Sequence, residues 1–128
     1  MTAGLSRRGF VLGGLGALAT VGAVGALSGC AAPAPVVVPS DDDATDIGAT
    51  VVASDNRYEP AEVTVRAGQA VTWVFAGANE HDVVANDRSF VSALTRAGSY
   101  THVFRDAGEF SYLCSIHPEM VGLVRVTG

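Results

Sequence analysis

Two β-type runs near the C-terminus enclose a short segment of unusual composition. The segment lies between Glu109–Leu113 and Val121–Val126 and reads Cys114-Ser115-Ile116-His117-Pro118-Glu119-Met120. A thiol, an imidazole and a thioether therefore occur within seven residues, on what the flanking runs predict to be a tight loop between two strands. Three metal-binding side chains on one such loop suit a soft or borderline metal ion.

Further short β-patterned runs separated by turn signals occupy residues 46–128, which we predict to form one domain. Apolar and polar residues alternate clearly in Ala70–Phe75, and Val, Thr and aromatic residues favour strands over helices. Seven short runs of this kind predict an all-β fold, an antiparallel-rich β-sandwich. The expected strands are Thr50–Ser54, Glu62–Arg66, Ala70–Phe75, His81–Ala85, Ser99–Phe104, Gly108–Cys114 and Gly122–Thr127.

A second histidine, His81, stands at the start of one of these expected strands. If two sheets pack face to face, His81 can meet the loop of Cys114, His117 and Met120 at one end of the sandwich. Two imidazoles, a thiolate and a weak axial thioether form the ligand set of a type 1 (blue) copper ion. The pair Cys114 and His117 alone is also compatible with half a zinc site, but structural zinc sites draw on Cys and His rather than Met.

Several segments of the domain carry a family resemblance. They are Tyr58–Trp73, His81–Val83, Ser99–Phe104, Ala107–Cys114 and His117–Val124. Together they resemble the small cupredoxins, which include plastocyanin, pseudoazurin and amicyanin, and the short gap between His117 and Met120 is most similar to amicyanins. The resemblance implies a Greek-key sandwich of about seven or eight strands and one type 1 copper ion held by His81, Cys114, His117 and Met120. It also implies a monomer that passes single electrons between transient protein partners and is not an enzyme.

Two residues depart from the pattern of this family. Asp82 stands directly after the first histidine, where many relatives have an asparagine that ties the two ligand loops together. A carboxylate accepts hydrogen bonds but cannot donate them as an amide does, so we expect different tuning of the metal by its surroundings. The other is His102, which we interpret as a hydrogen-bonded or edge-exposed imidazole. A role in metal binding or pH sensing is the alternative.

The resemblance further suggests that the edge of His117 is the port through which electrons pass. Ile116 and Pro118 would surround it with an apolar patch, and small, weak interfaces are what transient exchange requires. We expect Glu80, Asp82 and Glu119 to border this patch with negative charge, which would suit a basic patch on the partner.

The N-terminal residues 1–29 have the organisation of an export signal. Arg7 and Arg8 precede a mildly apolar run, Phe10–Leu27, which is typical of a twin-arginine signal; an uncleaved anchor helix is the alternative. Leu27-Ser28-Gly29-Cys30 resembles a lipobox, so we expect cleavage before Cys30 and acylation of it. The alternative is an ordinary signal peptidase site with a cysteine nearby. The predicted location is the outer, periplasmic face of the cytoplasmic membrane, held there by the lipid anchor.

A Pro-, Ala- and Asp-rich segment, residues 30–45, links this signal to the domain, and we predict a flexible tether whose three consecutive aspartates are solvated. Beyond residue 29 the chain has six arginines, no lysine and thirteen acids, a formal net charge of −7. So acidic a domain without a basic patch argues against nucleic-acid binding.

These features favour one of three classes of function. The leading interpretation is electron transfer at the outer face of the cytoplasmic membrane. The alternative is a copper-binding or copper-delivery protein without a redox cycle. An enzyme is disfavoured because the sequence has no second metal cluster, no paired catalytic carboxylates and no nucleophile–base pair.

Overall fold

Alternation of apolar and polar residues builds the strands of this protein, whose computed structural model describes residues 33–128. In β3 (Glu62–Arg66), Val63 and Val65 are buried and the residues between them are exposed. In β4 (Ala70–Phe75), Val71, Trp73 and Phe75 are buried in the same way. Because successive side chains of a strand point to opposite faces, each of these strands presents one apolar face to the interior.

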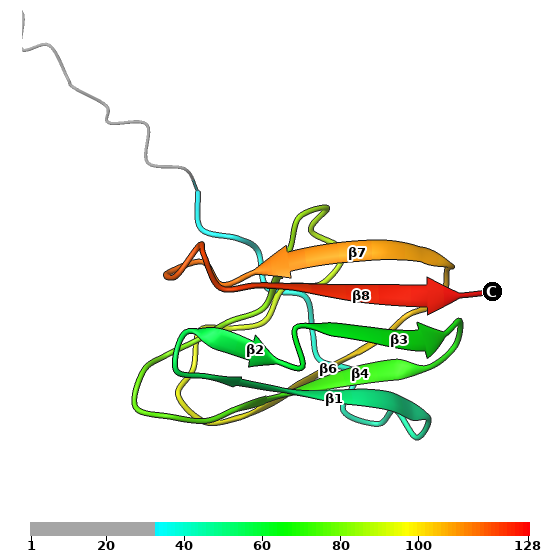
Figure 1. Cartoon of the computed structure of the whole chain (residues 1–128), viewed down its shortest axis with the longest axis horizontal. Helices are drawn as coiled ribbons and strands as arrows, with labels where there is room; N and C mark the ends of the chain where they lie inside the picture. Colours follow the sequence, from blue (N-terminus) through cyan, green and yellow to red (C-terminus); the bar gives the residue numbers. More distant parts are fainter. Residues whose placement is uncertain (1–32) are drawn as a thin grey trace, which may run out of the picture. The chain divides into compact units, whose positions relative to one another are not determined.

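Eight strands form two four-stranded sheets that pack face to face (Figure 1). One sheet has the order β2-β1-β4-β6 and the other the order β3-β8-β7-β5. Most pairs are antiparallel, but β1–β4 and β3–β8 are parallel. The predicted all-β sandwich is confirmed. The remaining strands are β1 (Ile47–Ser54), β2 (Arg57–Glu59), β5 (Val84–Ala85), β6 (Gly98–Val103), β7 (Gly108–Leu113) and β8 (Val121–Thr127).

Two local features differ from the sequence-based expectation. Arg57–Glu59 forms an additional strand, too short for its alternation to be recognised, and pairs with the end of β1. The expected strand His81–Ala85 is reduced to Val84–Ala85. His81 instead exchanges two backbone hydrogen bonds with Thr95, of 2.9 and 3.0 Å, as an isolated bridge. Within residues 33–128, no helix is long and apolar enough to cross a membrane.

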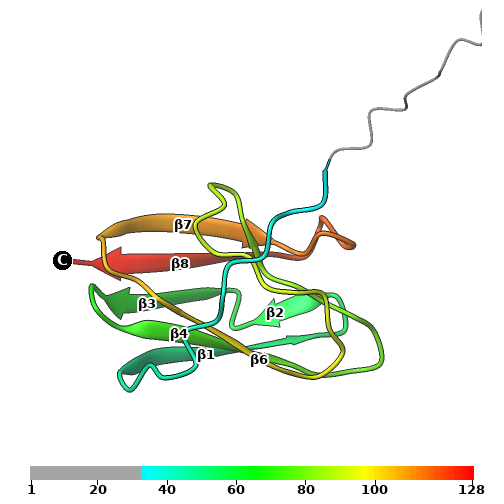
Figure 2. The same ribbon diagram turned by 180° about the vertical axis from the view of Figure 1, so that it is seen from behind.

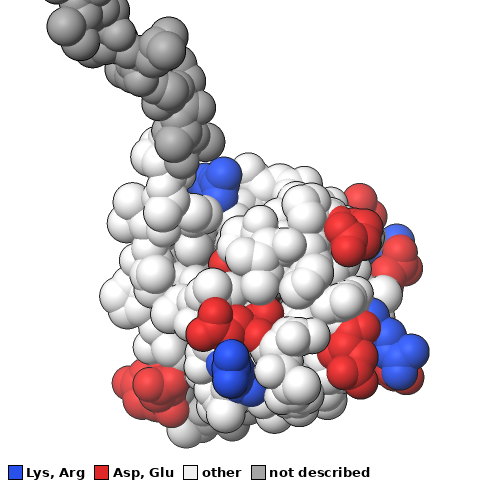
Figure 3. All heavy atoms as spheres, turned by 90° about the vertical axis from the view of Figure 1, so that its left-hand side faces the viewer, with Lys and Arg blue, Asp and Glu red and all other residues white. Residues whose placement is uncertain are grey.

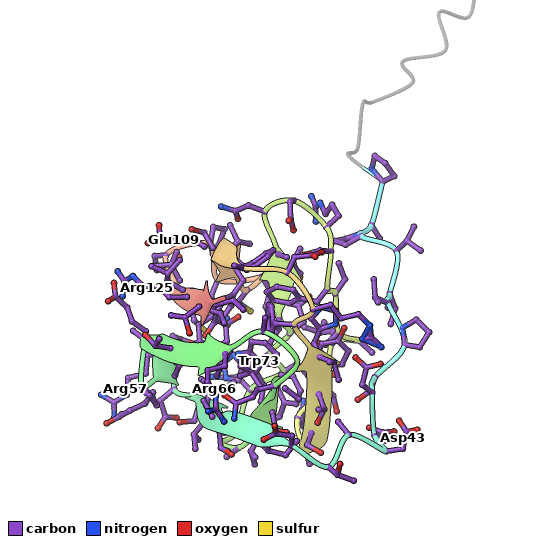
Figure 4. All side chains as sticks on the ribbon, turned by 90° about the vertical axis from the view of Figure 1, so that its right-hand side faces the viewer. Asp43, Arg57, Arg66, Trp73, Glu109 and Arg125 are labelled. Atoms are coloured by element: carbon purple, nitrogen blue, oxygen red, sulfur yellow. The ribbon has the colours of Figure 1, made fainter. Side chains whose placement is uncertain are left out.

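Trp73 occupies the centre of the interior between the two sheets (Figure 4). It stacks on Phe90 with ring centroids 5.4 Å apart and meets Tyr112 of β7 edge-on, also at 5.4 Å. Tyr112 lies opposite Gly122 in the β7–β8 register, and a Cβ atom at Gly122 would come 2.2 Å from the tyrosine ring. Glycine is therefore required at position 122 for Tyr112 to pack against Trp73.

The N-terminal strap, which we define as Val38–Asp43, lies along β6 (Figure 2). Because β6 is an edge strand, it has backbone groups with no partner inside its sheet. The strap supplies partners: the Asp41 amide donates to the Thr101 carbonyl at 2.8 Å, and an Asp41 carboxylate oxygen accepts from the Val103 amide at 2.8 Å. Ser40 Oγ accepts from the Thr101 amide at 2.9 Å.

These contacts refine the expectation for the segment 30–45. Its first residues, including Cys30, lie outside the described residues, as does the expected signal, residues 1–29. From Val38 onward the segment is hydrogen-bonded to the domain, beginning with the Val38 amide and the Val91 carbonyl at 2.8 Å. Asp42 and Asp43 are exposed, as expected of solvated carboxylates, whereas Asp41 is committed to β6. Composition could not indicate this, because the partners are strand-edge groups far away in sequence.

His102 of β6 packs against the aromatic interior close to the strap. Its ring lies 4.9 Å from Phe104 and 5.2 Å from Phe90, measured between centroids. Its Nδ1 is 3.6 Å from the nearer Asp41 carboxylate oxygen, too far for a hydrogen bond. Burial lowers the pKa of His102, although Asp41 opposes the effect. His102 thus departs from the expected hydrogen-bonded or edge-exposed imidazole: β6 is an edge strand, but the side chain is only 18% exposed and its Nδ1 has no hydrogen-bond partner among the described residues. Its neutral form is the one the fold stabilises.

Replacing His102 with phenylalanine should flatten the dependence of stability on pH. The pKa of His102 is lower in the folded state than in the unfolded chain. At pH values between that lowered pKa and the ordinary value of about 6.5, the unfolded chain therefore binds more protons than the folded protein. The free energy of unfolding consequently falls as the pH drops through this window. The loss is about 1.4 kcal/mol for each unit separating the two pKa values. Urea unfolding of wild type and His102→Phe between pH 5 and 8 measures it; equal slopes would contradict the assignment.

Candidate metal centre

The loop between β7 and β8 is closed by its own backbone. The Met120 amide donates to the His117 carbonyl at 2.8 Å, and the Cys114 amide donates to the Met120 carbonyl at 3.1 Å. Cys114 and Met120 thereby start and end a compact turn, and both side chains are buried in the core cluster. The predicted tight loop is confirmed.

His81 reaches the same end of the sandwich from the segment that follows β4. Its two backbone hydrogen bonds to Thr95 fix its main chain, and its side chain is completely buried. Neither ring nitrogen has a hydrogen-bond partner among the described residues. An unpaired buried polar group is costly, so a full account of this position requires a partner that protein atoms do not supply.

The three predicted donors His81, Cys114 and His117 converge. Their ligand atoms all lie within 4.8 Å of one another, and the two imidazole centroids are 5.7 Å apart. One metal ion between them would give a partner to one of the two unpaired ring nitrogens of His81 and to the unpaired Nδ1 of His117. Two imidazoles and a thiol that converge in a largely buried cluster therefore fit a copper ion of the blue type. The Met120 side chain is also buried, and its role as axial ligand stays a prediction.

The surroundings favour the protonation state that a ligand needs. Burial lowers the pKa of His81, and the neighbouring His117 lowers it further. A neutral imidazole has the free lone pair that a metal requires, so the protein keeps this ligand ready for binding near neutral pH. His117 differs in exposure: its Nδ1 is shielded, but the residue as a whole is partly open to solvent.

Asp82 connects the two segments that supply the donors. One of its carboxylate oxygens accepts from the Ser115 amide at 2.7 Å, and the other accepts from the Ser115 hydroxyl at 2.6 Å. Ser115 provides two donors, so an acceptor-only side chain fits this position. Tyr58 adds a third tie, because its hydroxyl donates to the Asp82 carbonyl at 2.5 Å. Sequence reasoning missed Ser115 and Tyr58, whose roles depend on contacts 33 and 24 residues away.

The surface around His117 agrees only in part with the expected acidic border. Glu80 and Glu119 are exposed, but Asp82 is only 5% exposed and so does not belong to that border. Ile116 and Val121 expose 47% and 57% of their surfaces and provide the apolar part. Figure 3 looks onto the end of the molecule where the β7–β8 loop turns; much of this face is uncharged, and acidic groups with a few basic ones interrupt it.

Comparison with known proteins identifies the family. Residues 46–127 match the family described as copper binding proteins, plastocyanin/azurin family. The chain belongs to this family. Copper is therefore its cofactor, and the cluster of His81, Cys114 and His117 matches a type 1 copper site. The resemblance inferred from the sequence is confirmed, and the structure is that of a cupredoxin.

Individual relatives point toward amicyanins. The chain is 30% identical to an amicyanin of Paracoccus denitrificans over 120 residues, which cover 85% of this chain and 88% of the relative. It is 34% identical to an amicyanin of Paracoccus versutus over 76 residues, or 55% of this chain and 58% of that protein's length. Among solved structures, a purple cupredoxin from Nitrosopumilus maritimus has a TM-score of 0.59 and 26% identity, covering 62% of this chain and 99% of its own.

Proposed function

We propose that this cupredoxin is a carrier of single electrons whose copper ligands are His81, Cys114 and His117, with Met120 as the axial ligand. The observation that carries the proposal is the convergence of three soft or borderline donors within 4.8 Å, two of them fully buried. A copper ion bound there would take up and release one electron without bond-making chemistry. Family membership supports electron transport as the general role.

The chain's own contribution is a rigid ligand frame. The backbone hydrogen bonds of the 114–120 loop and the tie between Asp82 and Ser115 hold donors from distant segments at fixed positions. A set of ligands that keeps its geometry when copper changes oxidation state keeps the reorganisation energy of electron transfer small. Complete burial of His81 and Cys114 also opposes release of the metal, which argues for a carrier rather than for copper delivery.

The visible spectrum tests the ligand assignment. Adding Cu(II) to the purified protein should produce the intense band of thiolate-to-copper charge transfer. Cys114→Ala should abolish the band completely, because it removes the thiolate, whereas Met120→Leu should keep it in altered form. A colourless wild-type complex, or a band that survives in Cys114→Ala, would overturn the assignment.

Rapid and reversible electron exchange with a redox protein, as against copper transfer to an acceptor, would distinguish the carrier from the delivery alternative.

We further propose that electrons pass at the exposed edge of His117, by transient docking of a redox partner, with the protein acting as a monomer. Ile116 and Val121 provide an apolar contact surface, and Glu80 and Glu119 lie outside the core as exposed charges. A partner with a basic patch would be attracted to this end of the molecule, and that attraction would weaken as salt screens it.

Reversing the charge of Glu119 tests this docking proposal. Glu119→Lys should slow electron exchange with a basic redox partner several-fold at low ionic strength, and the difference should fade toward 0.5 M salt. Stopped-flow oxidation of the reduced protein measures the rate. Asp106→Lys is the matched control, since it makes the same charge change in the exposed β6–β7 turn, at the opposite end of β7 from the ligand loop. Equal slowing by both variants would argue against steering at this end.

We propose, finally, that the mature protein is a lipoprotein on the outer face of the cytoplasmic membrane. The support is the sequence pattern alone: Arg7 and Arg8, the apolar run after them and the lipobox ending in Cys30. The intact mass of protein purified from membranes should correspond to a chain that starts at Cys30 and carries acyl groups. An unacylated N-terminus at another residue would exclude the anchor, and a Cys30→Ser variant should be missing from the membrane fraction.

A further inference from the structure

Asp82 is a buried charge with no cationic protein partner in the described part of the chain. It is 5% exposed, directly follows the ligand His81, and none of the ion pairs found among residues 33–128 includes it. Charged side chains are seldom buried in this way, because the lost hydration must be replaced by an opposite charge or by a metal. The position therefore requires an electrostatic account in addition to its role in tying the two loops together.

The contacts of Asp82 are those of an ionised carboxylate. Its two oxygens accept from the Ser115 amide at 2.7 Å and from the Ser115 hydroxyl at 2.6 Å. Neutral donors of this kind stabilise the negative charge but do not cancel it. The negative charge therefore remains inside the protein. It lies one residue after His81 in the sequence and is hydrogen-bonded to Ser115, which follows Cys114.

We propose that the carboxylate of Asp82 is the charge partner of the copper centre and lowers its reduction potential. This inference rests on the proposed copper site. A Cu(II) ion held there would have its two positive charges balanced by the Cys114 thiolate and the Asp82 carboxylate, because metal-bound imidazoles are neutral ligands. After reduction to Cu(I) by one electron from a redox protein, the same centre would carry one net negative charge in a poorly hydrated site. The oxidised state is therefore favoured relative to a centre with a neutral side chain at this position.

This charge effect can be separated from the structural tie. An asparagine at position 82 has nearly the same shape and would keep an oxygen for the Ser115 amide. Its NH2 group would face the Ser115 hydroxyl, which can accept as well as donate. Asp82→Asn thus preserves the connection between the two loops and removes only the charge. Asp82 is not among the donors that converge on the metal position, and both its oxygens bind Ser115, so the proposed effect is that of its field and not of a ligand.

The test is the reduction potential of the copper-loaded protein, measured by redox titration of the visible band. Asp82→Asn should raise the equilibrium constant for reduction by roughly ten- to a hundredfold, the effect of one unit charge about 6–12 Å away at an effective dielectric constant of about 20. Each tenfold step corresponds to about 59 mV for one electron. The matched control is Glu80→Gln, which removes an exposed charge on the other side of His81 and should change the constant by less than about threefold because water and salt screen it.

A second variant separates charge from loop geometry. Ser115→Ala keeps the carboxylate and removes one of its hydrogen bonds, so the negative charge is slightly less compensated. The change in reduction potential should therefore be small and opposite in sign to that of Asp82→Asn. A positive shift in Ser115→Ala as large as that in Asp82→Asn would show that the loop contact sets the potential and would overturn the proposal. An unchanged potential in Asp82→Asn, or an equal shift in Glu80→Gln, would overturn it as well.

Failure of the asparagine variant to fold would not leave the question open. Asp82→Ser introduces a smaller side chain that is also neutral, and its reduction potential must then be higher than that of the wild type. An unchanged reduction potential in this variant would refute the proposal. Unfolding of both neutral variants in the metal-free state, seen by circular dichroism, would make the carboxylate a structural requirement and refute it too. The visible band of the wild-type protein distinguishes failure of the copper site from failure of the role of Asp82. Absence of the band would contradict the copper site itself. Presence of the band, with no change of reduction potential in the Asp82 variants, would contradict only the role of Asp82.

Discussion

The contact of Trp73 with Tyr112 holds the two sheets at the separation on which the metal centre depends. Trp73 belongs to β4, the strand that leads to His81, and Tyr112 belongs to β7, two residues before Cys114. Their edge-on contact at 5.4 Å requires the space left by Gly122 on β8. Donors on segments that follow strands of different sheets can meet at one end because this packing leaves the sheets little freedom to slide.

The donors themselves oppose folding in the absence of a metal. The pocket contains a fully buried imidazole without hydrogen bonds and the shielded Nδ1 of His117, both of which lose hydration without compensation. Packing of the core and the closed 114–120 loop must outweigh this cost. Metal binding removes the penalty in the folded state alone, so copper should stabilise the fold in proportion to how tightly it binds. Stability and readiness for the metal are therefore linked through the same atoms.

Sequence patterns predicted those parts of the structure that depend on neighbours along the chain. The strands with clear alternation, such as Glu62–Arg66 and Ala70–Phe75, occur with the predicted bounds. Cys114, His117 and His81 were identified because their side chains have few other reasons to occur in this arrangement. The roles of Ser115 and Tyr58 were missed because both residue types are common, and only the folded chain places them against Asp82. The strap was missed for the same reason, since an acidic segment looks solvated until the edge of β6 is beside it.

Burial divides the carboxylates near the centre into two kinds with different effects. Glu80 and Glu119 are exposed, so water and salt screen them from the metal, and they act on molecules that approach the surface. Asp82 lies between Glu80 and Glu119 in sequence, but it is buried, so water and salt screen its charge much less. The two proposals therefore assign the encounter with a partner and the energy of the electron to different acidic residues. Because these residues do not share contacts, a change in one of the two properties need not alter the other.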